Sequence, residues 1–327
     1  MASSIKKVAV AGVSCHWIVS YSHYGTTDNS RPQPNGTLGP PIIRHLVKAG
    51  FDITLLSRDP AKAAETYAPP MKTVAADYTS VDALTAVLRD GAFDTLVILI
   101  NREQVTPQIN LMDAAAAVGG LHVIPSSFGT GYEHPKARQL GILIHKVPVE
   151  EHFLRLAEEN RITYTAINTG MFFDWALEKA GLPVNLLGGP TMLFDEGKVR
   201  LSVSTLDRIG EAVAIALLKR DELGLVNRFM YVQSAAVSQA QLLAYARELA
   251  PEREFKTVAV DTAAIEGPAL EKLEKGETGP EVSRPLMARF SFGLGLGLFE
   301  RCDNEMLGLK DMMEVEIKGL VGGYLGK

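Results

Sequence analysis

Residues 8–12, VAVAG, and residues 36–58, GTLGPPIIRHLVKAGFDITLLSR, set the expected fold of this 327-residue chain. The first belongs to a short β-branched run, Ile5–Ala11, that is bounded by glycine and typical of a buried parallel strand. The second predicts a helix from Leu38, with prolines in its first turn and an apolar stripe, ending at Gly50. The stretch Phe51–Leu56 predicts the next strand, so together they indicate a βαβ unit.

The same alternation continues along the next hundred residues. Further strands are expected at Lys72–Ala76, Thr95–Ile100, Leu121–Pro125 and Ile162–Ile167, and helices at Pro60–Tyr67, Ser80–Arg89, Thr106–Val118 and Val149–Asn160. Alternating strands and helices predict an α/β fold, a doubly wound parallel sheet of the Rossmann type, over residues 1–168.

The pattern loosens after Asn168. Helices are expected near Thr205–Lys219 and Ser238–Leu249, and a hairpin around Asp195–Gly197. No Ser/Gly linker or charge block separates this part from the sheet. Residues 169–327 are therefore expected to form mainly a smaller, interleaved C-terminal substrate region, with some segments returning to the core.

Composition excludes several classes of function. No apolar run approaches the roughly 20 residues of a membrane helix. A net charge of −5 without a basic cluster argues against binding to nucleic acid. Cys15 and Cys302 are the only cysteines, and the histidines have no ligand-type spacing, so we expect a cytoplasmic protein without a metal site or a disulfide framework.

The segment Val13–Gln33 interrupts the expected glycine turn. Without it, Gly12, Gly36 and Gly39 fall into a GxxGxxG pattern, and the spacing from Gly12 to Arg58 shortens toward the ~20 residues of a dinucleotide fingerprint. The residues at its two ends permit the codons of a short in-frame retained intron, and a genuine surface loop is the alternative. The turn places these residues at the cofactor pyrophosphate: Gly12, Asn35, Gly36, Thr37, Leu38 and Gly39.

The end of the second strand indicates which dinucleotide is bound. Ser57 and Arg58 stand where an NAD-specific protein has an acidic residue, and Lys62 follows. A bidentate cation suits the 2′-phosphate of NADP, so these three residues are assigned to the cofactor. An ordinary exposed arginine is the alternative.

Several motifs, in this order, resemble the NmrA-like and isoflavone-reductase-like group of atypical short-chain dehydrogenases. They are the GxxGxxG pattern, SRDPAK at 57–62, IPSSFG at 124–129, ITYTAINTGMFFDW at 162–175 and STLDRIGEAVA at 204–214. The resemblance covers most of the chain. It implies NADPH at the carboxyl ends of the strands and a smaller region over the nicotinamide.

The resemblance also implies roles for individual residues. Phe128 would lie near the nicotinamide, with Ser126 and Ser127 in the same crevice, although family reductases usually have an acidic residue in place of Ser127. Lys146 matches the catalytic lysine that orients the cofactor and relays a proton, and a solvated lysine at a helix start is the alternative. The tyrosine of ordinary short-chain dehydrogenases is absent, since Ile142 occupies its place.

Residues that follow the last expected core strand are assigned to the substrate pocket, because ligand-contacting loops lie at that edge of a sheet. They are Asn168, Gly170, Met171, Phe172 and Phe173, and for the last three a core position is the alternative.

Two functions remain open. One is an NADPH-dependent reductase that transfers hydride to a small aromatic or unsaturated metabolite, favoured by Lys146 and the apolar loop after Asn168. The other is a nonenzymatic NADP-sensing regulator that binds a protein partner, favoured by Ser127 and the missing tyrosine.

Overall fold

A computed structural model describes residues 5–12, 37–66, 71–131, 137–138, 145–180, 182–277 and 279–325. The chain divides into two compact units. The first unit comprises Met1–Phe128, His145–Asn168 and Asp207–Met230, and the second comprises Gly129–Ile144, Thr169–Leu206 and Tyr231–Lys327. No helix within the described ranges is long and apolar enough to span a membrane.

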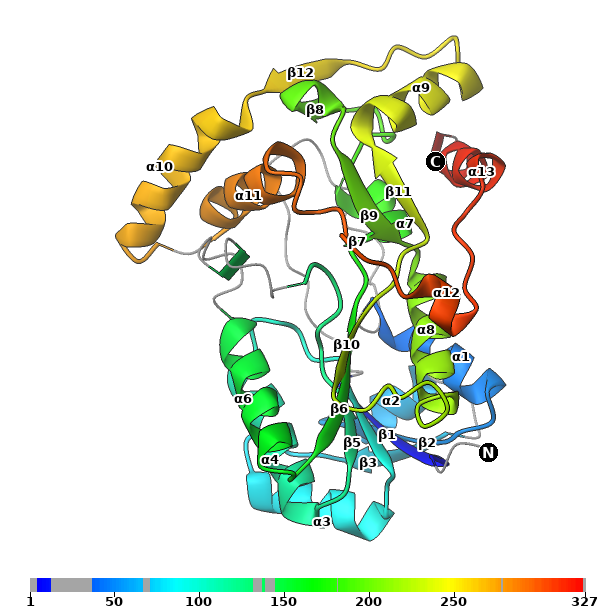
Figure 1. Cartoon of the computed structure of the whole chain (residues 1–327), viewed down its shortest axis with the longest axis vertical. Coiled ribbons are helices and arrows are strands. Elements are labelled where there is room, and N and C mark those ends of the chain that lie inside the picture. Colours follow the sequence, from blue (N-terminus) through cyan, green and yellow to red (C-terminus); the bar gives the residue numbers. More distant parts are fainter. Residues whose placement is uncertain are drawn as a thin grey trace. The chain divides into compact units, whose positions relative to one another are not determined.

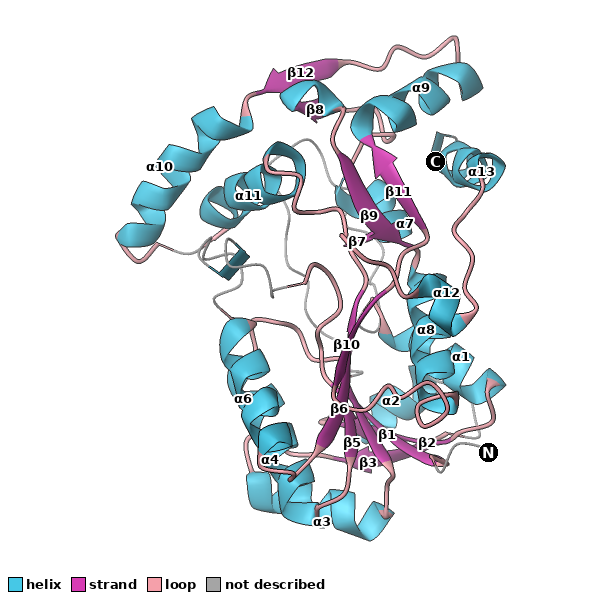
Figure 2. Cartoon of the chain, in the orientation of Figure 1, coloured by secondary structure: helices cyan, strands magenta, loops and turns pink. Residues whose placement is uncertain are grey.

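The first unit is built on a seven-stranded sheet, drawn in magenta in Figure 2. Its strands are β1 (Lys7–Ala11), β2 (Asp52–Ser57), β3 (Lys72–Ala75), β4 (Thr95–Ile98), β5 (His122–Ile124), β6 (Thr163–Asn168) and β10 (Arg228–Tyr231). Their order is β10-β6-β5-β4-β1-β2-β3, and each pair from β6 to β3 is parallel. The order reverses at β1, which lies between β2 and β4 and marks the topological switch point where such sheets bind ligands.

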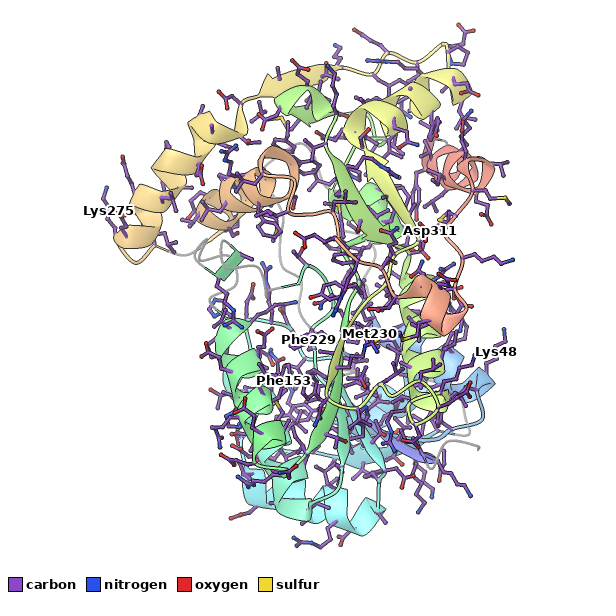
Figure 3. All side chains as sticks on the ribbon, viewed as in Figure 1. Lys48, Phe153, Phe229, Met230, Lys275 and Asp311 are labelled. Carbon is purple, nitrogen blue, oxygen red and sulfur yellow. The ribbon has the colours of Figure 1, made fainter. Side chains whose placement is uncertain are left out.

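Helices cover both faces of this sheet (Figure 1). On one face lie α3 (Val81–Gly91), α4 (Val105–Val118) and α6 (Val147–Glu158), and on the other α1 (Gly39–Lys48), α2 (Pro60–Thr66) and α8 (Leu206–Leu218). Between α6, β6 and β10, the rings of Phe153, Tyr164 and Phe229 form a cluster, with centroids 4.8 Å apart for Phe153–Tyr164 and 5.7 Å for Tyr164–Phe229. Phe153 and Phe229 are labelled in Figure 3. The predicted doubly wound α/β fold is therefore confirmed.

The second unit contains short strands and helices. Three strands, β7 (Met171–Phe172), β9 (Arg200–Ser204) and β11 (Ala235–Ser238), form one sheet, and β8 (Thr191–Phe194) with β12 (Thr257–Val260) forms another. The helices are α7 (Phe173–Trp175), α9 (Gln239–Leu249), α10 (Thr262–Glu274), α11 (Pro280–Ala288), α12 (Asn304–Leu307) and α13 (Glu314–Leu325).

The predicted hairpin around Asp195–Gly197 is wrong. A turn does form there, with Asp195 and Glu196 at φ of 44° and 64°. However, β8 before it pairs in parallel with β12, and β9 after it pairs with β7 and β11. The turn residues specify a local change of direction, whereas distant strands supply the pairing partners.

His122 of β5 lies fully buried inside the sheet of the first unit. Thr165 Oγ1 donates to the carbonyl of Leu225, so it accepts from His122 Nε2 at 3.0 Å. Thr163 Oγ1 then donates to Nδ1 at 2.9 Å. Burial, assisted by the positive charge of Arg220, lowers the pKa of His122 from 6.5 to about 3, while the Asp221 carboxylate opposes this shift. This histidine is therefore a neutral structural residue.

We expect His122 to destabilise the fold in acid. The unfolded chain protonates His122 near pH 6.5, whereas the folded chain does so only near pH 3. The contribution of neutral His122 to the free energy of unfolding is therefore complete above pH 6.5 and is lost as the pH falls. At ~1.4 kcal/mol per pKa unit, the loss between pH 7 and pH 4 is about 3 kcal/mol. The measurement is the free energy of urea unfolding against pH. The side chain of His122→Gln cannot take up a proton, so this part of the pH dependence of the unfolding free energy should vanish. Equal slopes in both proteins would contradict the assignment.

Candidate active site

Gly12 directly follows β1 at the switch point and has a conformation that only glycine adopts easily. Its φ is +92°, and a Cβ would lie 2.6 Å from the backbone nitrogen of Ile100 and 2.7 Å from the carbonyl carbon of Leu99. Both the torsion and the close approach of the β4 backbone therefore exclude a side chain. The Gly12 backbone therefore packs directly against the residues that follow β4, at the place where the sequence predicted a cofactor turn.

Tyr78 fastens this turn to the neighbouring strands, a role that the sequence did not reveal. Its hydroxyl accepts from Gly12 N at 3.0 Å and donates to the carbonyl oxygen of Leu56 at 2.5 Å. Burial raises the pKa of Tyr78 to about 12, against the opposing effects of the Gly12 hydrogen bond and the Arg58 charge. One neutral side chain thus connects the ends of β1 and β2.

Helix α1 follows the expected turn along the chain. Helix α1 has Leu38 as its N-cap residue and proline in its first turn, and no side chain among the described residues makes a capping hydrogen bond to it. Because Pro40 and Pro41 have no N–H, the amides that this helix end can offer to a phosphate are those of Leu38 and Gly39. Thr37, Leu38 and Gly39 lie here, whereas Asn35, Gly36 and the segment Val13–Gln33 lie outside the described residues.

The carboxyl end of β2 presents a cation. Ser57 is buried, and its hydroxyl accepts from Asp59 N at 3.1 Å and donates to Asp59 O at 3.0 Å. Asp59 Oδ1 in turn accepts from Lys62 N at 3.1 Å, as a helix cap does. Ser57 therefore shapes the turn, and Arg58 projects from it with an exposed side chain.

The carboxyl end of β5 carries the sequence IPSSFG. Ser126 Oγ donates to the carbonyl of Ile100 at 2.9 Å, which ties this end to that of β4. Ser127 is 4% exposed and Phe128 is 6% exposed. The three residues therefore form a packed edge, and the hydroxyl of Ser126 is used to hold it together.

Lys146 lies at the start of α6 and reaches this edge. Its Nζ donates to the carbonyl oxygen of Phe128 at 2.9 Å. Burial, followed by the positive charge of Arg102, lowers the pKa of Lys146 from 10.5 to about 7, and the Glu150 carboxylate partly opposes this. A lysine with this pKa exchanges its proton near neutral pH, as a general acid must.

Arg102 and Glu150 were not singled out in the sequence. Arg102 follows β4, and Glu150 lies one helical turn after Lys146 with 2% of its surface exposed. The position of Arg102 after a strand end was the available clue. Nothing in the sequence marks Glu150, because several acidic residues surround it on α6.

Asn168 ends β6 with a buried amide. The residue is 1% exposed, and neither its Oδ1 nor its Nδ2 has a hydrogen-bond partner among the described residues. Leaving a buried polar atom unpaired costs about 1–3 kcal/mol, so such an amide points to a ligand group.

The remaining residues assigned to substrate belong to the second unit. Gly170 has φ of +64°, and a Cβ would lie 2.2 Å from the carbonyl oxygen of Ser202, so close packing explains this glycine. Met171 and Phe172 are partly buried in β7. Phe173 is fully buried in the hydrophobic core of this unit, the position that the sequence left as its alternative.

Residues 35–192 match a family model described as NAD(P)H-binding. Over these residues the chain is similar to an NAD(P)H-binding family. The match begins two residues beyond the end of the segment Val13–Gln33 and includes Arg58, Lys146 and Asn168.

Two fungal proteins that are similar to this chain are named as oxidoreductases. The oxidoreductase poxI of Penicillium oxalicum is 27% identical over 215 residues, which are 64% of this chain and 65% of the relative. The oxidoreductase aprR of Aspergillus flavus is 26% identical over 295 residues, 84% of this chain and 91% of the relative. The chain is therefore related to oxidoreductases.

Solved structures with the same fold include reductases. The complex of leucoanthocyanidin reductase from Vitis vinifera with NADPH aligns with a TM-score of 0.73 and 17% identity, covering 98% of this chain and 100% of that one. An isoflavone reductase aligns with a TM-score of 0.68 and 15% identity, covering 98% and 99%. The resemblance to the isoflavone-reductase-like group is thus confirmed at the level of the fold.

The residues of the first unit fit an NAD(P)H cofactor. Gly12 has the positive φ that a glycine turn after β1 uses, and no described side chain caps helix α1. Arg58 lies on the β2 side of this turn. The edge formed by Phe128, Lys146 and Asn168 lies on the other side, at β5 and β6.

Proposed function

We propose that this chain is an NADPH-dependent reductase that transfers a hydride to a small aromatic or unsaturated metabolite in the cytosol. The observation that carries the proposal is Lys146, whose Nζ is held at the β5 edge by the Phe128 carbonyl and has a pKa of about 7. A reductase needs such a proton donor next to the nicotinamide, whereas a cofactor-sensing protein does not.

The preference for NADPH rests on the end of β2. Arg58 is exposed there, so its guanidinium is available to the 2′-phosphate. The neighbouring Asp59 carboxylate caps Lys62 N and is thereby directed into its own turn. The arrangement offers a cation where a protein that binds the free 2′-hydroxyl offers a carboxylate.

Bound NADPH supplies the hydride and its two electrons. The carbon–oxygen or conjugated carbon–carbon double bond of the substrate accepts the hydride at one atom and develops negative charge at the other. The ammonium of Lys146 gives its proton to that atom, and the neutral amine regains a proton from solvent. The Phe128 carbonyl holds Nζ in place throughout, because it accepts a hydrogen bond from one of the three N–H groups of the ammonium.

Transfer of an isotopic label tests the proposal. The full chain is incubated with NADPH that carries deuterium at both positions of the transferring carbon, together with metabolites that copurify with it and a panel of aromatic ketones and enones. We expect one reduced product that contains one deuterium for each NADP⁺ formed. NADPH binding by calorimetry without reduction of any of these compounds would instead favour the NADP-sensing regulator.

A further inference from the structure

We propose that Asn168 binds the carboxamide of the nicotinamide ring through two reciprocal hydrogen bonds. The assignment replaces the substrate contact expected from the sequence with a cofactor contact. It rests on binding of NADPH to the first unit and does not require the proposed turnover.

The sheet order determines which half of the cofactor reaches this residue. The pyrophosphate belongs at the turn after β1, and the phosphorylated ribose belongs at Arg58 after β2. These two anchors direct the adenine half away from β4. The nicotinamide half therefore extends the other way, across the ends of β4, β5 and β6.

Asn168 lies beyond the end of the neighbouring strand β5, at the carboxyl edge of the sheet. The register aligns Val123 of β5 with Tyr164 of β6, and β5 ends one residue later. Asn168 lies four residues after Tyr164, about 13 Å further along the strand at ~3.3 Å per residue. It consequently lies past the end of β5, on the edge where Lys146 meets the Phe128 carbonyl.

The chemistry of the unpaired amide identifies its ligand. Oδ1 needs a donor and Nδ2 needs an acceptor, and both atoms are buried on one planar group. A second primary carboxamide offers an acceptor and a donor side by side in the same plane. It therefore satisfies both atoms with two N–H···O bonds, and NAD(P)H carries one such carboxamide, on the nicotinamide ring.

Such a contact also has a consequence for hydride transfer. A nicotinamide ring held by one glycosidic bond can rotate and present either face to a substrate. Two parallel hydrogen bonds to Asn168 fix the plane of the carboxamide and hence select one rotamer of the ring.

Calorimetric titration of the full chain tests the inference with two ligands. NADPH contains the carboxamide, whereas 2′,5′-ADP contains the adenosine and 2′-phosphate but no nicotinamide. We expect Asn168→Leu, which retains size without polar atoms, to bind NADPH at least about tenfold more weakly and 2′,5′-ADP unchanged. The matched control Arg58→Ala should weaken both ligands in parallel.

A cofactor analogue provides a test without any substitution. In the acetylpyridine analogue of NADP⁺, a methyl group replaces the amide nitrogen and removes its donor. The unmutated chain should bind this analogue more weakly than NADP⁺, and Asn168→Leu should bind the two almost equally.

The binding measurements distinguish a missing carboxamide contact from a loss of cofactor binding as a whole. If the unmutated chain binds NADP⁺ and the analogue equally, or if Asn168→Leu weakens NADPH and 2′,5′-ADP by one common factor, the carboxamide contact is overturned. If the unmutated chain binds neither NADPH nor 2′,5′-ADP, cofactor binding itself fails, and the proposed function fails with it. Intact cofactor binding without any reduction of substrates affects the proposed function alone.

Discussion

Replacing Lys146 by alanine is expected to lower turnover about a hundredfold or more while NADPH binding remains measurable. A positioned general acid contributes about 10²–10⁴ in rate, and alanine has no proton to give. The proposed cofactor contacts at Gly12 and Arg58 are unchanged in this variant, so the affinity for NADPH should fall much less than kcat. The measurement pairs steady-state turnover of a reduced substrate with calorimetric titration of NADPH. Unchanged turnover in Lys146→Ala would move the proton transfer to another group.

The pH profile separates proton transfer from a structural role of Lys146. Because the protonated form donates, turnover should fall as the pH rises through about 7. Arg102→Gln removes a positive charge that lowers the Lys146 pKa, so the fall should shift to higher pH. Glu150→Gln removes a negative charge that raises this pKa, so the fall should shift to lower pH. Opposite shifts in the two variants would be difficult to explain by packing, and a profile insensitive to both would contradict the role.

The first unit could be predicted from the sequence because its signals are local. The runs VAVA at 8–11 and TLVILI at 95–100 are short, apolar and bounded, and their strands β1 and β4 became central in the sheet. The second unit offered weaker signals. Residues Asp195–Gly197 do form the turn that was predicted, yet β12, more than 50 residues later, supplies the partner of β8.

Candidate site residues could be proposed from the sequence where a strand end or a motif marks them, as for Gly12, Arg58 and Lys146. Tyr78 was not recoverable as a fastening residue, because its role depends on which backbone atoms lie near its hydroxyl. The depressed pKa of Lys146 likewise arises from burial and from Arg102, which approaches from another loop. Such effects depend on tertiary packing, which spacing along the chain does not encode.

Removing the segment Val13–Gln33 is expected to tighten NADPH binding by about tenfold to a hundredfold. The described residues on both sides are compatible with a dinucleotide turn, since Gly12 has a positive φ and no described side chain caps α1, which begins at Gly39. Only the shortened chain joins Gly12 directly to Pro34 and brings Gly36 into the same turn. Hydrogen bonds from these amides to a charged phosphate are worth about 1.5–3 kcal/mol each, so recovery of one accounts for this gain.

Folding should survive in both forms of the chain, so the comparison isolates cofactor binding. Each doubling of loop length costs only ~0.6 kcal/mol, and thermal unfolding of the two proteins without ligand should therefore differ little. The measurement is a parallel NADPH titration of both forms, with sequencing of mature transcripts across the Gly12–Pro34 junction. A retained intron requires tighter binding by the shortened protein and transcripts that lack the segment. If mature transcripts keep the segment and the full chain binds NADPH equally tightly, Val13–Gln33 is a genuine loop, and the cofactor turn must form with it in place.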